Sequence, residues 1–209
     1  MTILALEFSS ARRSVAMARG GAVLAEAFEQ SAERGTKVFG LIEKVLAAAK
    51  MSREEIDTIA VGLGPGSYTG IRAAIAVAQG WQLARGVKLL GVSSVKGLAA
   101  QAQVEKIFGH VNLVVDAQRG EFYLSAWEIS PAERQQISPL AIVPAAEVEA
   151  CQLRGEICAG PELERTLFPS AAAVAQLARG RTDFVPGERL EPVYLRETNF
   201  VKAPAGRKV

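Results

Sequence analysis

Histidine is almost absent from this chain of 209 residues, with His110 as the single example. A metal site built on two histidine ligands is therefore excluded within the chain. A Ser-His-Asp triad gains no support either, because His110 begins a predicted strand and no nucleophile is indicated beside it. Cysteine is also scarce: Cys151 and Cys158 are separated by six residues, which is neither a zinc nor a redox spacing. We therefore expect two plain thiols in a reducing compartment and predict no bound zinc or iron.

Signals for a membrane, for secretion or for nucleic-acid binding are also missing. Residues 1–4 carry no basic segment ahead of an apolar run, so no signal peptide is expected, and no apolar stretch is long enough to span a bilayer. The net charge of +2 is too small to indicate nucleic-acid binding. With 49% hydrophobic and 22% charged residues, the chain is typical of a soluble protein with one large or two small domains. We expect it in the cytoplasm, with no membrane partner.

Glycine, in contrast, is concentrated in residues 61–72, between a predicted strand at 56–61 and a predicted helix at 71–84. A strand, a glycine turn and a helix N-terminus can together bind an anion, because amides and the helix dipole point outward there. However, no lysine completes a P-loop, and the dinucleotide pattern fails at Thr69. On chemistry alone a structural turn is favoured, with Ser67 or Thr69 as the helix cap. The candidate phosphate contacts are Gly64, Gly66, Ser67, Thr69, Ser9 and Ser10.

The order of predicted elements indicates an α/β protein of two lobes. Three strands with a hairpin turn at Gly20-Gly21 precede alternating helices and strands, which favours the actin-like ATPase fold (ASKHA, ribonuclease-H-like), each lobe having a mixed sheet and flanking helices. We expect an N-terminal lobe at 1–104 and a smaller C-terminal lobe at 105–209. The predicted strands are 2–8, 14–18, 22–29, 56–61, 88–92, 110–116, 121–129, 142–143, 156–159 and one from Pro192; the predicted helices are 36–50, 71–84, 94–103, one from Pro144, and 170–178; residues 130–139 are predicted to form a loop.

Four stretches of the sequence resemble the TsaB family, also called YeaZ. Gly64-Pro65-Gly66-Ser67-Tyr68-Thr69-Gly70-Ile71-Arg72 looks like the family signature, and residues 4–10, 115–123 and 192–196 agree with it. The resemblance covers almost the whole chain. It implies the actin-like fold and a subunit of the bacterial machinery that places threonylcarbamoyl on a tRNA adenosine. Where the family usually has aspartate at the end of the first strand, this chain has Glu7, for which we prefer a hydrogen-bonded structural role.

The resemblance also implies that the chain is not the catalyst. The catalytic relative of this family holds a metal with a His-x-x-x-His pair on the first helix of its N-terminal lobe. This chain has Thr36-Lys37-Val38-Phe39-Gly40 there. In the second lobe, Asp116 is followed by Arg119, and an ion pair that shapes the turn is the interpretation we favour.

The helix predicted at 71–84 has no charged residue between Arg72 and Arg85. Such a helix is either buried on all sides or covered by a partner, and its stripe of small residues would let another helix approach closely. The residues leave both readings open, while the resemblance favours a partner, because the family pairs through two helices of its N-terminal lobe. The expected interface consists of Val38, Phe39, Ile42, Leu46, Ala73, Val77, Gly80, Trp81 and Ala84.

The resemblance therefore implies a non-catalytic scaffold subunit that dimerises with a TsaD-type transferase. A TsaE-type ATPase would join the assembly, and tRNA would be reached indirectly through the complex; whether the chain alone is a homodimer stays open. The alternative is an actin-like ATP-dependent phosphotransferase using the glycine loop and Glu7. A metalloendopeptidase is nearly excluded by the histidine count. A scaffold subunit requires no cofactor, although weak nucleotide binding stays open. The role of the basic tail 202–209 also stays open.

Overall fold

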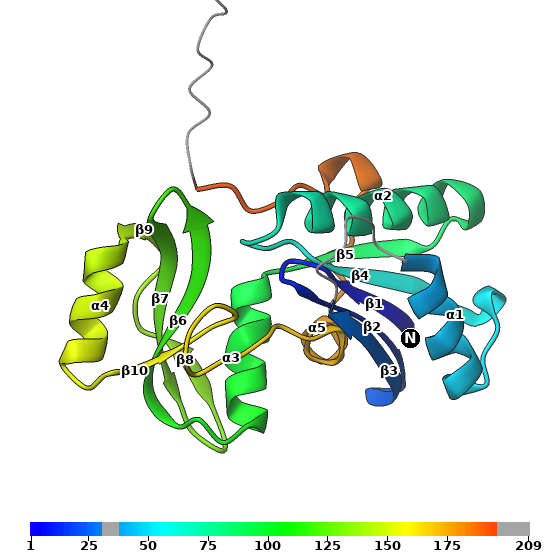
Figure 1. Cartoon of the computed structure of the whole chain (residues 1–209). Coiled ribbons are helices and arrows are strands. Elements are labelled where there is room, and N and C mark those ends of the chain that lie inside the picture. The colour runs from blue at the N-terminus through cyan, green and yellow to red at the C-terminus, as the bar shows by residue number, and fades with distance from the viewer. Residues whose placement is uncertain (31–37, 196–209) are drawn as a thin grey trace, which may run out of the picture.

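The computed structural model describes residues 1–30 and 38–195, and its first sheet forms the centre of the N-terminal half of the chain (Figure 1). The strand order is β3-β2-β1-β4-β5, in which β1, β2 and β3 are antiparallel and β4 and β5 run parallel to β1. The antiparallel arrangement of the first three strands is the one that the sequence predicted. The strands are β1 (Thr2–Glu7), β2 (Arg12–Arg19), β3 (Ala22–Gln30), β4 (Thr58–Gly62) and β5 (Lys88–Val92).

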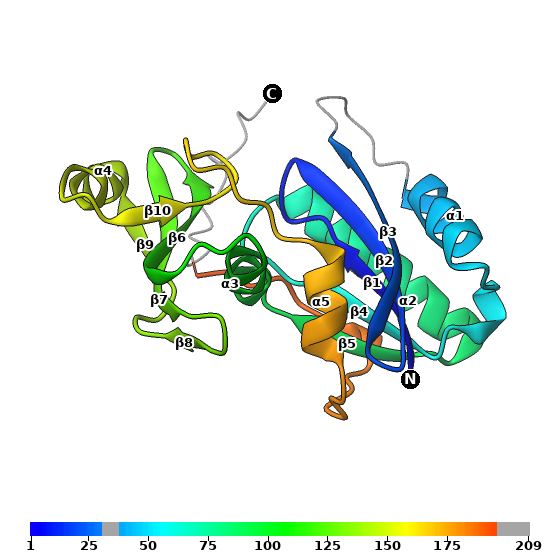
Figure 2. The same cartoon turned by 90° about the horizontal axis from the view of Figure 1, so that it is seen from below.

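Alternate side chains of the central strands pack into two separate hydrophobic cores, one on each face of this sheet. Leu4 and Leu6 of β1 pack with α1 (Val38–Ala49) and α2 (Tyr68–Arg85). Ile3 and Ala5 of the same strand pack with α5 (Ala171–Ala178) on the opposite face, as Figure 2 shows. Because successive residues of a strand point to opposite faces, β1 is buried along its whole length.

The second sheet has the order β10-β6-β7-β8, with β9 also paired to β7. The helix α3 (Ser94–Val104) packs against it through Val95, Leu98, Ala99 and Ala102. On its other side, Val148 and Cys151 of α4 (Ala145–Leu153) contact a smaller core that also contains Cys158. The strands are β6 (Gly109–Gln118), β7 (Glu121–Ile129), β8 (Arg134–Gln136), β9 (Ala141–Pro144) and β10 (Ile157–Ala159).

After the second sheet, the chain returns to the first one. The helix α5 buries Ala171, Val174, Ala175 and Ala178 against it, and Val185 donates its N–H to the carbonyl of Leu89 in β5 at 3.0 Å. These residues belong to the range expected in the C-terminal lobe. The division of the chain at residue 104 stays a proposal.

The α/β actin-like fold predicted from the sequence is confirmed, with several local corrections. The loop predicted at 130–139 contains β8, whose three residues are all exposed and polar, so it shows no hydrophobic alternation and pairs through its backbone. No strand is formed by residues 192–195; Pro192 lacks an N–H, and Val193 donates its N–H to the carbonyl of Leu63 at 2.8 Å. The helix α2 begins at Tyr68, three residues earlier than expected, because Ser67 caps it. Thr36, Lys37 and the tail 202–209 lie outside the described residues.

Two short 3-10 helices complete the described structure: η1 (Arg53–Glu55) and η2 (Gly187–Arg189). The N–H of Ser52 donates to the Glu55 carboxylate at 2.9 Å, which is the contact of a capping box. The side chain of Gln79 on α2 donates to the carbonyl of Gly187 at 2.8 Å, so η2 is attached to the outer surface of α2.

Candidate functional site

A cleft of about 810 Å³ lies where the two halves of the chain meet, and we call it the inter-lobe cleft. It is lined from the first half by the β1–β2 turn and the glycine loop, and from the second half by the β6–β7 hairpin. All four stretches that carry the family resemblance contribute to it. The lining residues used below are Ser9, Ser10, Gly66, Ser67, Tyr68, Thr69, Asp116, Gln118, Arg119, Tyr123, Glu162 and Tyr194.

The glycine loop packs against the backbone of the turn that follows β1. A Cβ atom on Gly66, whose φ is +143°, would lie 2.0 Å from the carbonyl oxygen of Ser9. A Cβ on Gly70 would lie 2.1 Å from the carbonyl oxygen of Phe8. The N–H of Ser67 donates to that Ser9 carbonyl at 2.7 Å. These glycines are therefore required for a close approach between two parts of the chain.

Several amides of the loop are already bonded to protein acceptors. Gly64 donates its N–H to Oγ of Ser94 at 3.0 Å, and Gly70 donates to Oγ of Ser67 at 3.3 Å. Ser67, and not Thr69, is thus the cap of α2. Of the six candidate phosphate contacts, Gly64 lies outside the cleft lining, while Gly66, Ser67, Thr69, Ser9 and Ser10 belong to it. Because the amides of Gly64, Ser67 and Ser9 are engaged within the protein, the residues present fit a phosphate group poorly.

Glu7 is fully buried and does not line the cleft. Its carboxylate accepts the N–H of Ser9 at 2.8 Å and the hydroxyl of Ser94 at 2.8 Å. Burial raises the pKa of Glu7, against the lowering effect of these hydrogen bonds. The Ser94 hydroxyl in turn accepts the N–H of Gly64, so Glu7 is connected to the glycine loop through Ser94. This geometry supports the structural reading of Glu7 over a role in phosphate chemistry.

The β6–β7 hairpin presents a carboxylate to the cleft. Asp116 accepts the N–H of Gln118 at 2.7 Å and also the Gln118 side-chain amide, and no ion pair to Arg119 is found among the described residues. The predicted Asp116–Arg119 ion pair is therefore wrong: the turn is shaped by Gln118, which with Arg119 adopts positive φ. Glu162 lies beside Asp116, whose N–H it accepts at 3.4 Å. Partial loss of hydration and the Asp116 charge raise the pKa of Glu162.

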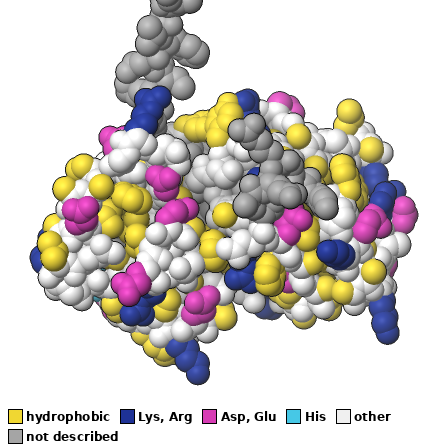
Figure 3. Space-filling view, in the orientation of Figure 1, with side chains coloured by type: hydrophobic (Ala, Val, Ile, Leu, Met, Phe, Trp, Pro, Cys, Tyr) yellow, Lys and Arg dark blue, Asp and Glu magenta, His cyan; other side chains and the backbone are white. Residues whose placement is uncertain are grey.

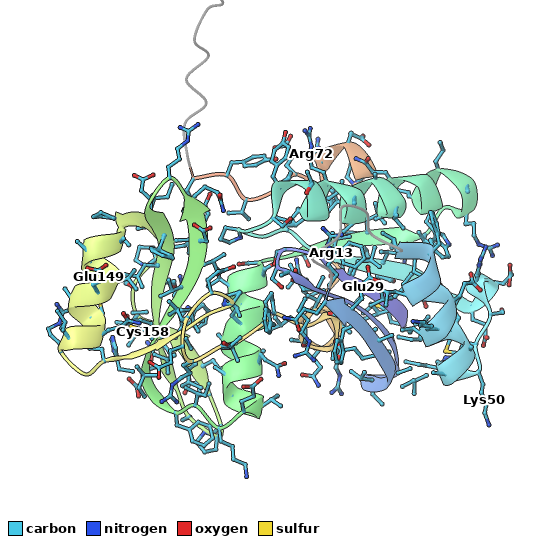
Figure 4. All side chains as sticks on the ribbon, in the orientation of Figure 1. Arg13, Glu29, Lys50, Arg72, Glu149 and Cys158 are labelled. Atoms are coloured by element: carbon cyan, nitrogen blue, oxygen red, sulfur yellow. The ribbon has the colours of Figure 1, made fainter. Side chains whose placement is uncertain are left out.

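All three tyrosines of the chain line the inter-lobe cleft. The rings of Tyr68 and Tyr194 have centroids 5.8 Å apart and are tilted by 40°. Arg72 stacks on Tyr68 with Cζ 4.8 Å from the ring centroid, near the start of α2 (Figure 4). Each tyrosine belongs to a different stretch of the family resemblance, although none is among the site residues predicted from the sequence. The one feature of the sequence that could have indicated them is that tyrosine occurs only three times in the chain.

A second concave surface lies between α1 and α2, and we call it the helix groove. It has a volume of about 570 Å³, and Figure 3 shows apolar and charged side chains interspersed on the side of the molecule that carries these helices. Six of the nine predicted interface residues line it, namely Phe39, Ile42, Val77, Gly80, Trp81 and Ala84.

Exposure separates the nine predicted interface residues into groups. The side chain of Phe39 is 65% exposed, and a Cβ on Gly80 would meet no atom within 4 Å. Val38 and Leu46 are instead buried in the core beneath α1, and Ile42 and Trp81 belong to the same buried core although they also line the groove. Ala73 lies outside the lining. The groove is therefore open at Phe39 and Gly80, where a partner could make contact.

Two further properties of the described residues bear on function. Residues 1–30 and 38–195 contain no group of three or more His, Cys, Asp and Glu side chains able to hold a metal ion. Within the same ranges, no helix has the length and apolar character needed to cross a membrane.

Comparison with known proteins defines the class. The family model described as "TsaD: tRNA N6-adenosine threonylcarbamoyltransferase" matches residues 4–178, and the chain belongs to this family. Within it, the chain is a member of the TsaB/YeaZ group. It is 28% identical to "tRNA threonylcarbamoyladenosine biosynthesis protein TsaB" of Escherichia coli, with both chains covered completely. The protein of the same name from Bacillus subtilis is 27% identical over 66% of this chain and 60% of that one. The solved structure of YeaZ from Pseudomonas aeruginosa superposes with a TM-score of 0.77 at 26% identity, covering 93% of this chain and 99% of that chain.

Proposed function

We propose that this chain is a non-catalytic subunit in the formation of threonylcarbamoyladenosine, the modification of the adenosine beside the tRNA anticodon. It acts by dimerising with a TsaD-type catalytic subunit through the helix groove. The transfer of threonylcarbamoyl takes place on that partner. Names of the relatives support the pathway, and the groove supports the mode of action.

The observation that carries the proposal is the open apolar surface between α1 and α2. Phe39 projects from α1 with 65% of its side chain exposed. On the α2 side of the groove, Gly80 and Ala84 have small side chains or none, so the surface there projects little. An exposed aromatic residue beside a row of small ones is suited to receive a helix, since small residues allow close backbone approach. Arg53, Glu54 and Arg85 surround the groove, which gives it a polar rim.

The residues of the chain support a partner role over independent catalysis. Its one histidine, His110, lies in β6 of the second sheet, away from both helices of the groove. Glu7, the acid that the phosphotransferase alternative requires, is sealed from the cleft. The full assembly includes a TsaE-type ATPase, and tRNA is engaged through the complex in the cytoplasm. Without its partner, the same groove can pair two copies of the chain.

The decisive binding experiment places a charge in the helix groove without disturbing the fold. Gly80→Arg adds a side chain where the structure has open space, and removal of a helical glycine stabilises the helix by about 1 kcal/mol. In a complex, the same arginine would be buried in a groove whose carboxylates, Glu43 and Glu54, already pair with Arg53 and Arg85, at a cost of about 3–5 kcal/mol. Val104→Arg is the matched control, because Val104 is also exposed on a helix but lies at the end of α3.

We expect Gly80→Arg to melt at or above the wild-type temperature and to lose at least a hundredfold in affinity for the TsaD-type subunit in calorimetry. Val104→Arg should bind like the wild type. Equal affinity of a folded Gly80→Arg variant would remove the helix groove from the interface.

A further inference from the structure

The inter-lobe cleft borders the glycine loop and the β1–β2 turn, but its chemistry is not that of a phosphate site. Loop amides that could cradle phosphate are bonded to Ser9, Ser67 and Ser94. Among residues 1–30 and 38–195, no lysine lines the cleft, and Arg119, the single cationic residue of that described lining, lies exposed on the hairpin. Asp116 and Glu162 would instead repel a phosphate.

Asp116 and Glu162 are neighbouring acidic residues of the cleft lining. The N–H of Asp116 points to the Glu162 carboxylate at 3.4 Å, which fixes the two residues as neighbours. Within residues 1–30 and 38–195, neither carboxylate takes part in an ion pair. The bonds that Asp116 accepts come from Gln118, a neutral residue. Like charges held together destabilise one another, and a cation between them would relieve the repulsion.

The aromatic lining complements these carboxylates. Tyr68, Tyr123 and Tyr194 all border the same cavity, with Tyr68 and Tyr194 in ring contact at 5.8 Å. The face of a tyrosine ring attracts ammonium and guanidinium groups. Tyr68 already makes this interaction on one side, with Arg72 at 4.8 Å from its centroid. Aromatic rings combined with carboxylates are the groups that recognise organic cations.

We propose that the inter-lobe cleft binds a primary ammonium or guanidinium group, held by the Asp116 and Glu162 carboxylates and by the faces of the tyrosine rings. The cation can be a free small molecule or the side chain of a lysine or arginine in a protein segment. The proposal concerns a different surface from the helix groove and is independent of the function proposed above.

Calorimetry on the full chain tests the proposal with matched probes. The cationic probes are spermidine and the capped tripeptide acetyl-Ala-Lys-Ala-amide; the neutral control is the same peptide with an acetylated lysine, and ATP with magnesium represents the phosphate reading. We expect at least one cationic probe to bind in a salt-sensitive manner. The acetylated peptide should bind at least tenfold more weakly than its cationic counterpart if the peptide is the ligand. Preference for spermidine or for the peptide identifies the source of the cation.

Substitutions then assign the binding to the cleft. Glu162→Gln and Tyr194→Leu should each weaken the binding of the preferred cation at least fivefold. Glu164→Gln, an exposed glutamate two residues away that does not line the cleft, should leave it unchanged. Circular dichroism verifies that each variant is folded. The proposal is overturned if neither cationic probe binds, if Glu162→Gln binds like the wild type, or if ATP binds more tightly than both cations.

Discussion

A Cβ atom on Gly62 would lie 2.0 Å from Oε2 of Glu7. The Glu7 carboxylate thus fills the space that any side chain at position 62 would need, at the end of two neighbouring parallel strands. The longer arm of glutamate, compared with the aspartate usual in the family, is matched here by a glycine on the adjacent strand.

This pairing predicts strong coupling between the two positions. Gly62→Ala should destabilise the protein by about 1–3 kcal/mol through overpacking. Glu7→Asp withdraws the carboxylate by one methylene, so the double variant should recover part of that loss. Urea denaturation of the wild type, both single variants and the double variant measures the coupling energy. Strictly additive effects would show that the two side chains do not compete for space.

The stability contributed by Glu7 should depend on pH. Because burial raises its pKa in the folded state above the ordinary 4.5, the folded protein holds the Glu7 proton more tightly than the unfolded chain does. That stabilisation is complete below the unfolded pKa and is lost as pH rises through the folded pKa. Glu7→Gln is permanently neutral and keeps the shape of the side chain. The melting temperature of Glu7→Gln relative to wild type should therefore rise between pH 4.5 and pH 8. A difference that does not change with pH would mean that Glu7 titrates normally.

The helix α5 should depend on its cap. Oγ of Ser170 accepts the N–H of Ala173 at 3.1 Å, so Ser170→Ala should cost about 1 kcal/mol of stability. Ser93 is the matched control, since it occupies the N-cap of α3 without a side-chain capping bond. Ser93→Ala should change the free energy of unfolding by less than about 0.5 kcal/mol. Equal losses in the two variants would show that the capping bond is not what stabilises α5.

The first sheet could be predicted from the sequence because its signals are local. Alternating apolar residues mark β2 and β3, Gly20-Gly21 marks their turn, and the glycine loop marks the end of β4. The strand β8 carries no such signal, since Arg134–Gln136 are polar and exposed and pair only through the backbone. The destination of α5 could not be predicted either. Its alanines indicate a buried helix, but they do not indicate whether the first or the second sheet will cover them.

For the candidate sites, too, local spacing could be predicted from the sequence but tertiary placement could not. Phe39, Val77 and Gly80 were expected on one surface, and the structure places them around one groove, because helical spacing determines which residues share a face. Helical spacing does not reveal which of those faces is covered within the chain, so Val38 and Leu46 were included although the core buries them. The meeting of Tyr68, Tyr123 and Tyr194 depends on tertiary structure alone, since they are far apart in the sequence.

The most direct test of the central claim is to reconstitute tRNA threonylcarbamoylation with the TsaD-type and TsaE-type subunits and to quantify the modified adenosine by mass spectrometry. We expect the product to form only when this chain is present. Gly80→Arg should reduce the rate at least tenfold, while Val104→Arg should support the wild-type rate. A full rate in the absence of this chain, or with folded Gly80→Arg in its place, would contradict the proposal that the chain acts as a partner subunit through the helix groove.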